Sequence, residues 1–180
     1  MSIPEAIRSL IQTNALPELG PGPRPGVKSQ SELRSPLDAA SAELKLPANN
    51  KDLIRALVLL WHDHLEPAHV LAQSIDNPDG AFVHGIMHRR EPDYGNAAYW
   101  FRHVGEHQTF PEIARRAEGL LASRKELRNR LISNGNWNPF GFIDSCRDVA
   151  GRSNASAEVA LLQQLQQHET EALLEYLCQP

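Results

Sequence analysis

The sequence has little sulfur and few aromatic residues: among 180 residues it contains two Cys, two Met and 6% aromatics. Cys146 and Cys178 supply neither a disulfide framework nor a cysteine pair with zinc-ligand spacing. The first residues carry no basic and apolar leader, and the longest apolar run, Ala56 to Trp61, is far too short to cross a bilayer. We therefore expect a cytoplasmic protein without a membrane-spanning segment.

An excess of one charge is also absent. The 18 Lys and Arg against 22 Asp and Glu give a formal net charge of -4 at pH 7, whereas a general nucleic-acid binder carries a basic patch or a domain-wide basic excess. The local arginine clusters have acidic neighbours, which is typical of solvated helix faces. We therefore expect no general nucleic-acid binding.

Motifs of established enzyme families are missing as well. The sequence has no phosphate-binding Walker loop, no HExxH zinc motif, no nucleophile elbow and no EF-hand loop. The cysteines do not suggest an activated nucleophile, since Cys146 lies on an apolar stripe and Cys178 lies close to the C-terminus. Whether the protein is an enzyme is left open.

Apolar residues recur at helical spacing along most of the chain, and no segment alternates like a strand. The length suits one domain, and we expect an all-α antiparallel stack or bundle of about seven or eight helices. The helix that begins near Asn50 has almost no polar face up to Trp61, so we expect it at the buried centre. The last helix should run from about Asn154 to Cys178, with the glutamine pairs between residues 163 and 167 as polar residues of no special role.

A Pro/Gly-rich stretch follows the first short helix. Its prolines and glycines are Pro17, Gly20, Pro21, Gly22, Pro23, Pro25 and Gly26. These residues remove backbone donors and interrupt helices. We expect residues 1–48 to form an N-terminal helix and an extended arm that packs on the domain, and residues 49–180 to form the helical domain.

Two short segments, Leu65-Glu66-Pro67-Ala68 and Tyr94-Gly95-Asn96-Ala97, occupy the same point of two successive helix pairs. They resemble helical-repeat units such as TPR or Sel1. The spacing is shorter than the TPR period of about 34 residues, and only two copies are visible. The sequence therefore predicts a weakly repeat-like stack.

Five of the eight histidines fall between His62 and His88. The densest polar run extends from His84 to Glu91 and lies on a predicted helix from Pro78 to about Glu91. At about 100° per residue, one face of that helix is apolar and the opposite face carries His84, His88 and Glu91. By contrast, the later histidines are expected at the surface: His103, His107 and His168.

A divalent-metal site is the first hypothesis for this cluster. Neutral imidazoles at i and i+4 can reach one ion together, and a carboxylate one turn further on, Glu91, could join His84 and His88. The remaining ligands would come from the preceding helix pair, which carries His62, His64 and His69. The candidate ions are Zn, Fe, Mn and Ni.

A pocket for an anionic small molecule is the second hypothesis. Arg89 and Arg90 could hold a carboxylate or phosphate through paired hydrogen bonds. His84 or His88 could donate a hydrogen bond or a proton, which would suit acid–base catalysis. The candidate walls are aromatic: Trp61, Tyr94, Tyr99 and Trp100.

The helical phase places Arg90 toward the apolar side. An unpaired buried charge is very costly, so Arg90 needs a partner. The natural candidates are Asp63, Asp93 and Glu66.

Two non-catalytic alternatives remain open. Arg89, Arg90, Glu91 and Asp93 could form an ion-pair network that fixes the angle between two helices, with the histidines satisfied by carbonyls or water. A repeat-like stack could also offer a concave face to a protein partner or a second copy of the chain, with the Pro-rich arm docked in it.

The run HGIMHRREPDYGNAAYWFR, from His84 to Arg102, resembles a signature that recurs in a group of uncharacterised small microbial proteins. The upstream run from Trp61 to Ser74 resembles part of the same pattern. The likeness implies no activity, because none is known for that group. The sequence therefore predicts a helical protein with a metal or small-molecule site on the His84–Glu91 helix, or alternatively an interaction module.

Overall fold

The computed structural model describes residues 2–153 and 156–179, and it has the expected all-α fold. The first helices are α1 (Glu5–Ile11), α2 (Gln30–Glu43), α3 (Ala48–Trp61), α4 (Leu65–Ala72) and α5 (Pro78–Arg90). They are followed by α6 (Tyr94–Val104), α7 (Phe110–Leu121), α8 (Lys125–Leu131), α9 (Pro139–Val149) and α10 (Ala157–Leu177). Residue 154, where the last helix was expected to begin, lies outside the described residues.

Within the described residues the helices number ten, more than the seven or eight expected. One source of the difference is α2, which lies within the stretch where an extended arm was expected. A capping box starts it: the Ser29 side chain accepts from the Glu32 backbone, and the Glu32 carboxylate accepts from the Ser29 backbone N–H at 2.7 Å. This arrangement satisfies two free donors at the helix start and outweighs Pro36 in the second turn.

The expectation of no strands was wrong at one place. Residues Ile132–Ser133 and Asn136–Trp137 form a two-stranded antiparallel hairpin, β1 and β2. Asn134 and Gly135 both adopt positive φ, 51° and 78°, as a tight hairpin turn requires. Strands of two residues are too short to show alternation, so only the Asn-Gly pair could have indicated this turn.

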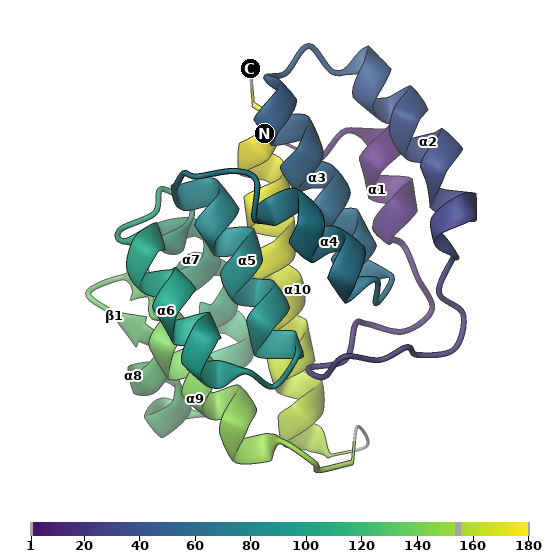
Figure 1. Cartoon of the computed structure of the whole chain (residues 1–180). Helices are drawn as coiled ribbons and strands as arrows, with labels where there is room; N and C mark the ends of the chain where they lie inside the picture. The colour runs from purple at the N-terminus through teal and green to yellow at the C-terminus, as the bar shows by residue number, and fades with distance from the viewer. Residues whose placement is uncertain (1, 154–155, 180) are drawn as a thin grey trace.

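Two helices form the centre of the fold. Every residue of α3 from Ala56 to Trp61 is buried, as its uniformly apolar sequence predicted. The 21-residue α10 runs past α3 on one side and past α7 and α9 on the other, and Figure 1 shows it passing through the middle of the molecule. The helix pair α5 and α6 makes the most extensive contact between any two helices.

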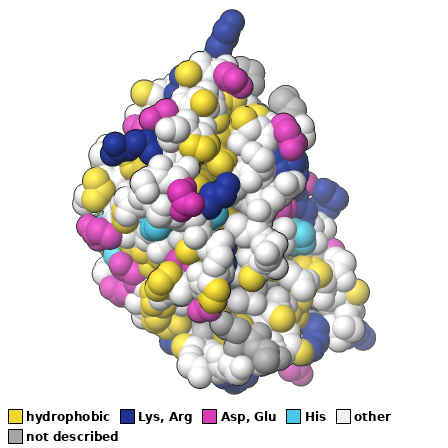
Figure 2. Space-filling model, turned by 90° about the vertical axis from the view of Figure 1, so that its right-hand side faces the viewer, with side chains coloured by type: hydrophobic (Ala, Val, Ile, Leu, Met, Phe, Trp, Pro, Cys, Tyr) yellow, Lys and Arg dark blue, Asp and Glu magenta, His cyan; other side chains and the backbone are white. Residues whose placement is uncertain are grey.

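None of the helices in the described part of the chain is long and apolar enough to cross a bilayer. On the face shown in Figure 2, Lys and Arg side chains are interspersed with Asp and Glu side chains.

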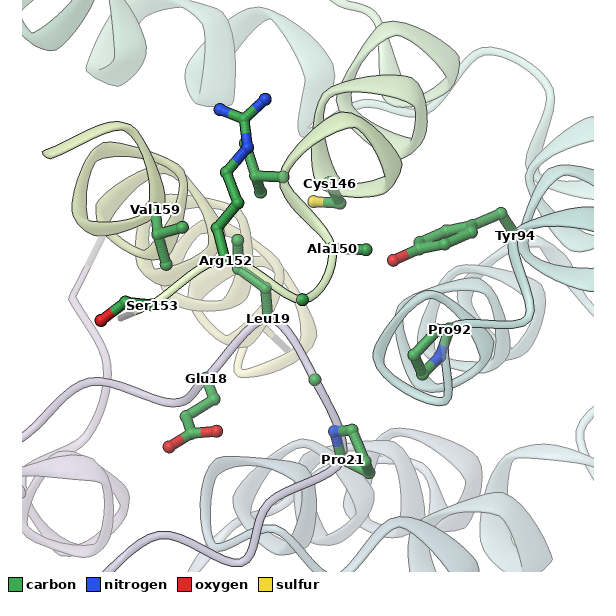
Figure 3. Close-up of a pocket in the computed structure, with 13 residues that line it drawn as sticks. Glu18, Leu19, Pro21, Pro92, Tyr94, Cys146, Ala150, Arg152, Ser153 and Val159 are labelled. Carbon is green, nitrogen blue, oxygen red and sulfur yellow. The ribbon is translucent and has the colours of Figure 1, made fainter. Parts of the chain in front are cut away.

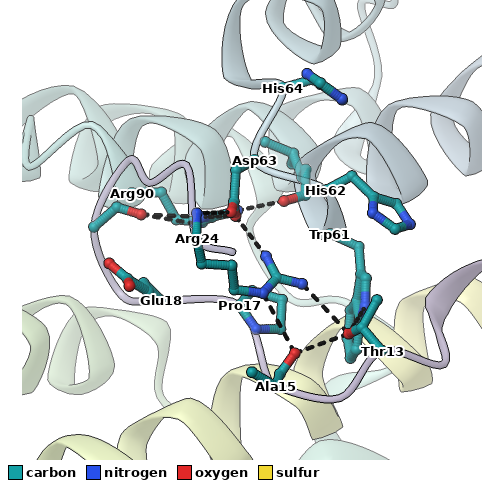
Figure 4. Close-up of polar contacts among 12 residues, drawn as sticks. Thr13, Ala15, Pro17, Glu18, Arg24, Trp61, His62, Asp63, His64 and Arg90 are labelled. Carbon is teal, nitrogen blue, oxygen red and sulfur yellow. Dashed lines mark hydrogen bonds and ion pairs between the residues drawn. The ribbon is translucent and has the colours of Figure 1, made fainter. Parts of the chain in front are cut away.

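The Pro/Gly-rich segment between α1 and α2 lies against α3 through Arg24. The Arg24 guanidinium donates to Oδ1 of Asp63 at 2.7 Å, and the Arg24 backbone N–H donates to Oδ2 of Asp63 at 2.9 Å (Figure 4). Gly22 makes this approach feasible, because a Cβ there would lie 2.7 Å from Cγ of Asp63. The segment is thereby tied to the turn after α3.

Asp63 is also the ion-pair partner of the buried Arg90. Arg90 donates to Oδ1 of Asp63 at 2.7 Å and to the Gly20 carbonyl at 3.0 Å, and it also donates to the Leu60 carbonyl. The Asp63 carboxylate is fully buried, and it faces two arginines. Backbone carbonyls take up the remaining guanidinium donors, so the two charges are spread over several acceptors.

We predict that Asp63→Asn lowers the free energy of unfolding by about 3–5 kcal/mol, because it leaves two buried guanidinium groups without their anion. Urea unfolding of the full chain measures the change. Asp148→Asn is the matched control, since Asp148 pairs with Arg130 at 2.7 Å with both side chains about half exposed. That control should cost less than about 1 kcal/mol. Equal losses in the two variants would contradict the prediction.

Candidate metal centre

Helix α5 carries His84 and His88, two of the histidines that the sequence predicts as metal ligands. Its start is well defined, since the Asn77 side chain accepts from the Gly80 backbone N–H at 2.8 Å and Pro78 occupies the first turn. Four residues apart, His84 and His88 therefore project to the same side of α5. At His84 that side is covered by neighbouring helices, since His84 is only 3% exposed, whereas His88 is partly exposed.

His69 of α4 completes a triad with His84 and His88. One ring nitrogen from each of the three imidazoles lies within 4.8 Å of the other two. The ring centroids of His69 and His84 are 4.6 Å apart, and those of His84 and His88 are 5.0 Å apart. Two adjacent helices thus bring together three metal-ligating side chains, two of them i and i+4.

Neither ring nitrogen of His84 has a hydrogen-bond partner among the described residues, although both atoms are buried. Burial, together with the neighbouring His69 and His88, lowers the pKa of His84 to about 4. His84 is therefore neutral at physiological pH. Neutral imidazole is the form that binds metal ions.

Acidic side chains lie beside the other two histidines. Oε2 of Glu91 lies 3.2 Å from Nδ1 of His88, and Oε2 of Glu66 lies 3.9 Å from Nδ1 of His69. Burial lowers the pKa of His88, and Glu91 opposes that shift. Glu91 is thus in place to orient His88, as carboxylates beside metal-ligating histidines commonly do.

Trp100 of α6 covers one face of the His84 ring. The two rings stack with centroids 3.9 Å apart and planes inclined by 16°. Gly85 allows α6 to approach so closely, because a Cβ at Gly85 would lie 2.7 Å from the ring of Phe101. The indole therefore forms an apolar wall of the site, and its position depends on the absence of a side chain at Gly85.

We predict that Gly85→Ala destabilises the protein by roughly 1–3 kcal/mol, the usual cost of overpacking a core. Phe101 is buried and packs edge-on against Phe82 with centroids 5.2 Å apart, so its ring has little room to move. The displacement of α6 should also weaken the stacking of Trp100 on His84 and change tryptophan fluorescence. Gly119→Ala on α7 is the control, because its Cβ would meet nothing within 4 Å. Similar unfolding midpoints for the two variants would contradict the prediction.

The structure does not bring Arg89 to the histidines. Its side chain is fully buried on another face of α5, where it donates to both carboxylate oxygens of Glu169, at 3.1 and 2.5 Å. The guanidinium also lies over the ring of Phe142, 4.4 Å from its centroid. Arg90 is occupied by Asp63, as described above, so the two arginines point in different directions and form no clamp for one anion.

The remaining predicted site residues are also spread apart. The Trp61 indole N–H donates to Oγ1 of Thr13 at 3.0 Å, and Tyr99 is 48% exposed on α6. His62 is completely buried: its Nδ1 accepts from the Lys28 backbone at 3.1 Å, and its Nε2 lies 2.7 Å from the Leu10 carbonyl. Nδ1 therefore carries no hydrogen, Nε2 donates to Leu10, and His62 ties two N-terminal segments to α3.

Sequence reasoning missed two buried polar groups on α10. Glu169 is the anion for Arg89, and the Gln166 amide donates to the Glu18 carbonyl at 3.1 Å. Both are at most 3% exposed, so the expectation that the glutamines of this helix have no special role was wrong for Gln166. Helical phase could have indicated both, because residues 166 and 169 lie on the same face as the buried Leu162, Leu165 and Leu173.

His107 was expected at the surface, and this was also wrong. It is 7% exposed, with Nε2 2.8 Å from Oδ1 of Asp79 and Nδ1 2.8 Å from Oγ1 of Thr109. Because Nδ1 also accepts from the Thr109 backbone, the hydrogen is on Nε2 and faces Asp79. His107 joins the start of α5 to the start of α7. His103 is exposed, as expected.

A separate cavity of about 420 Å³ lies between the Pro/Gly-rich segment, the turn after α5 and the end of α9. Figure 3 shows Tyr94 and Cys146 on one side of it and Leu19 and Val159 on the other. Burial raises the pKa of the Cys146 thiol to about 12, so the thiol is protonated at neutral pH and is a poor nucleophile. The size suits a small ligand, and the lining combines apolar side chains with Glu18, Tyr94 and Arg152.

No family model matches the chain, and no match was found among curated proteins or solved structures. The likeness of residues 84–102 to a microbial signature stays a prediction.

Proposed function

We propose that the protein binds one divalent transition-metal ion through His69, His84 and His88. The observation that carries the proposal is His84, whose two buried nitrogens have no hydrogen-bond partner among the described residues and lie beside two further imidazoles. Buried polar atoms are nearly always paired, and leaving one unpaired costs about 1–3 kcal/mol. An ion at the centre of the triad would satisfy the nitrogen that faces it.

The other two buried histidines of the described chain support this interpretation by contrast. His62 and His107 each have partners for both ring nitrogens. The fold therefore pairs buried imidazoles where their role is structural. His84 differs from both, and it is also the one that lies within ligand distance of two other histidines.

The donor set favours some ions over others. Three neutral imidazoles suit Zn, Ni and Fe, whereas Mn prefers more oxygen ligands. Zn–N bonds of about 2.0–2.1 Å place tetrahedral nitrogens roughly 3.4 Å apart, so rotations of the side chains would be enough to close the triad on an ion. Zinc is therefore the first ion to test.

We predict that the full chain, purified without a His tag and stripped with a chelator, takes up about one equivalent of Zn²⁺. Titration calorimetry and metal analysis after desalting measure affinity and stoichiometry. His69→Gln, His84→Gln and His88→Gln should each weaken binding by more than about 100-fold, because even groups behind the ligands contribute about 10–100-fold. Circular dichroism establishes that each variant is folded.

The matched control is His103→Gln, an exposed histidine whose ring centroid lies 5.8 Å from that of Trp100 but which is outside the triad. It should bind zinc like the parent chain. Ni²⁺ supplies a second readout, since a paramagnetic ion beside His84 should quench the stacked Trp100, and Trp100→Phe should lose the quenching while still binding the ion. Failure of the parent chain to bind zinc, or zinc affinities of the three triad variants equal to that of the parent chain, would refute the proposal.

We predict that Glu91→Gln weakens zinc binding by about 10–100-fold without changing the stoichiometry, because it removes the negative charge 3.2 Å from His88. Glu66→Gln is the comparison, since Glu66 lies 3.9 Å from His69 and its side chain is 78% exposed. Its effect should be smaller, because solvent screens an exposed charge. An equal effect of the two variants would argue against a role of Glu91 beyond general surface charge.

A further inference from the structure

The histidine triad leaves part of the surroundings of a bound ion without a protein ligand. Among the described residues the cluster comprises three donors, whereas divalent transition ions take four to six ligands. Structural zinc sites close the shell with four protein ligands, and catalytic sites keep a position for water. A triad of three imidazoles matches the second kind.

Solvent reaches the triad from the side of His69 and His88. The His69 side chain is 27% exposed and that of His88 is 13% exposed, whereas His84 is buried. The open positions of an ion would therefore point toward solvent and away from the core. Water and small solutes could exchange there without unfolding any helix.

The two carboxylates beside the triad offset the charge of a divalent ion, so the occupied site would carry little net positive charge. The two side chains in ion-pair contact with its histidines are both acidic, Glu66 and Glu91. The nearest arginines in the sequence, Arg89 and Arg90, are buried in pairs with Glu169 and Asp63. Phosphate esters usually require cationic side chains, so a neutral substrate fits better.

Resting on the proposed metal site, we infer that the zinc form is a hydrolase for small neutral carbonyl compounds such as carboxylic esters. The ion lowers the pKa of a bound water, which loses one proton to solvent. The resulting hydroxide attacks the carbonyl carbon, and the bond from that carbon to the alcohol oxygen breaks. The electron pair leaves with the alcohol oxygen, which takes a proton from solvent. The new carboxylic acid releases its proton to solvent, and water replaces the carboxylate product on the ion. No oxidation or reduction is involved.

The test compares the zinc-loaded and the metal-free full chain with 4-nitrophenyl acetate, a neutral ester, and with 4-nitrophenyl phosphate, an anionic one. We expect zinc to raise the rate of acetate hydrolysis by at least about tenfold over the metal-free chain and over an equal concentration of free zinc. His84→Gln should abolish the increase. His103→Gln should retain it, which separates metal-dependent hydrolysis from attack by an exposed imidazole. The phosphate ester should show no zinc-dependent rate.

The outcomes distinguish this inference from the proposed function. If the chain binds one equivalent of zinc but the zinc-loaded and metal-free rates are equal, the hydrolase inference is wrong and the metal site stands. If no zinc binds, both fail. If zinc accelerates hydrolysis of the phosphate as much as that of the acetate, the selection for neutral substrates is wrong.

Discussion

The buried carboxylate of Asp63 is the interaction on which the arrangement of the N-terminal half depends. It accepts from Arg24 of the Pro/Gly-rich segment and from Arg90 at the end of α5, and it lies in the turn that ends α3. Desolvating two cations and one anion is costly, and it is tolerable only because backbone carbonyls, including those of Gly20 and Leu60, accept the remaining donors. Asp63 itself adopts a positive φ of 64°, which aims its side chain at both arginines. Through this one group, three segments distant in sequence are held together, and the C-terminal end of α5 is fixed in place.

The position of α5 matters because three consecutive residues at its C-terminal end contact three different neighbouring elements. A helix turns by about 100° per residue, so His88, Arg89 and Arg90 project in three directions. His88 faces His69 of α4, Arg89 faces Glu169 of α10, and Arg90 faces Asp63. The two ion pairs hold the helix in two different directions and oppose its rotation, which keeps His84 and His88 aligned with α4. The arginines that look like ligands in the sequence thus act as supports for the histidines.

Much of the architecture follows from local patterns. The uniformly apolar stretch of α3 predicted its burial, Asn77-Pro78 predicted the start of α5, and the i and i+4 spacing predicted that His84 and His88 share a face. The need of Arg90 for a buried partner follows from its phase, and Asp63 was among the candidates. The roles of Gln166, Glu169 and His107 were missed, since polar residues were assumed to face water. Glu169 and Gln166 can be inferred from helical phase, but His107 cannot, because it lies between helices and depends on contacts with Asp79 and Thr109.

The sequence by itself determined the all-α class, the helical phase of α5 and the crowding of histidines between residues 62 and 88. Only the tertiary structure decided which histidines meet: His69 joins His84 and His88, whereas His62, which lies with His69 one helix pair upstream, is bound by the backbones of Leu10 and Lys28. The physical reason is that helical periodicity gives the direction in which a side chain points but not the element that covers it. That covering element depends on long-range packing, such as the close approach of α6 at Gly85 and the anchoring of α5 by Asp63 and Glu169.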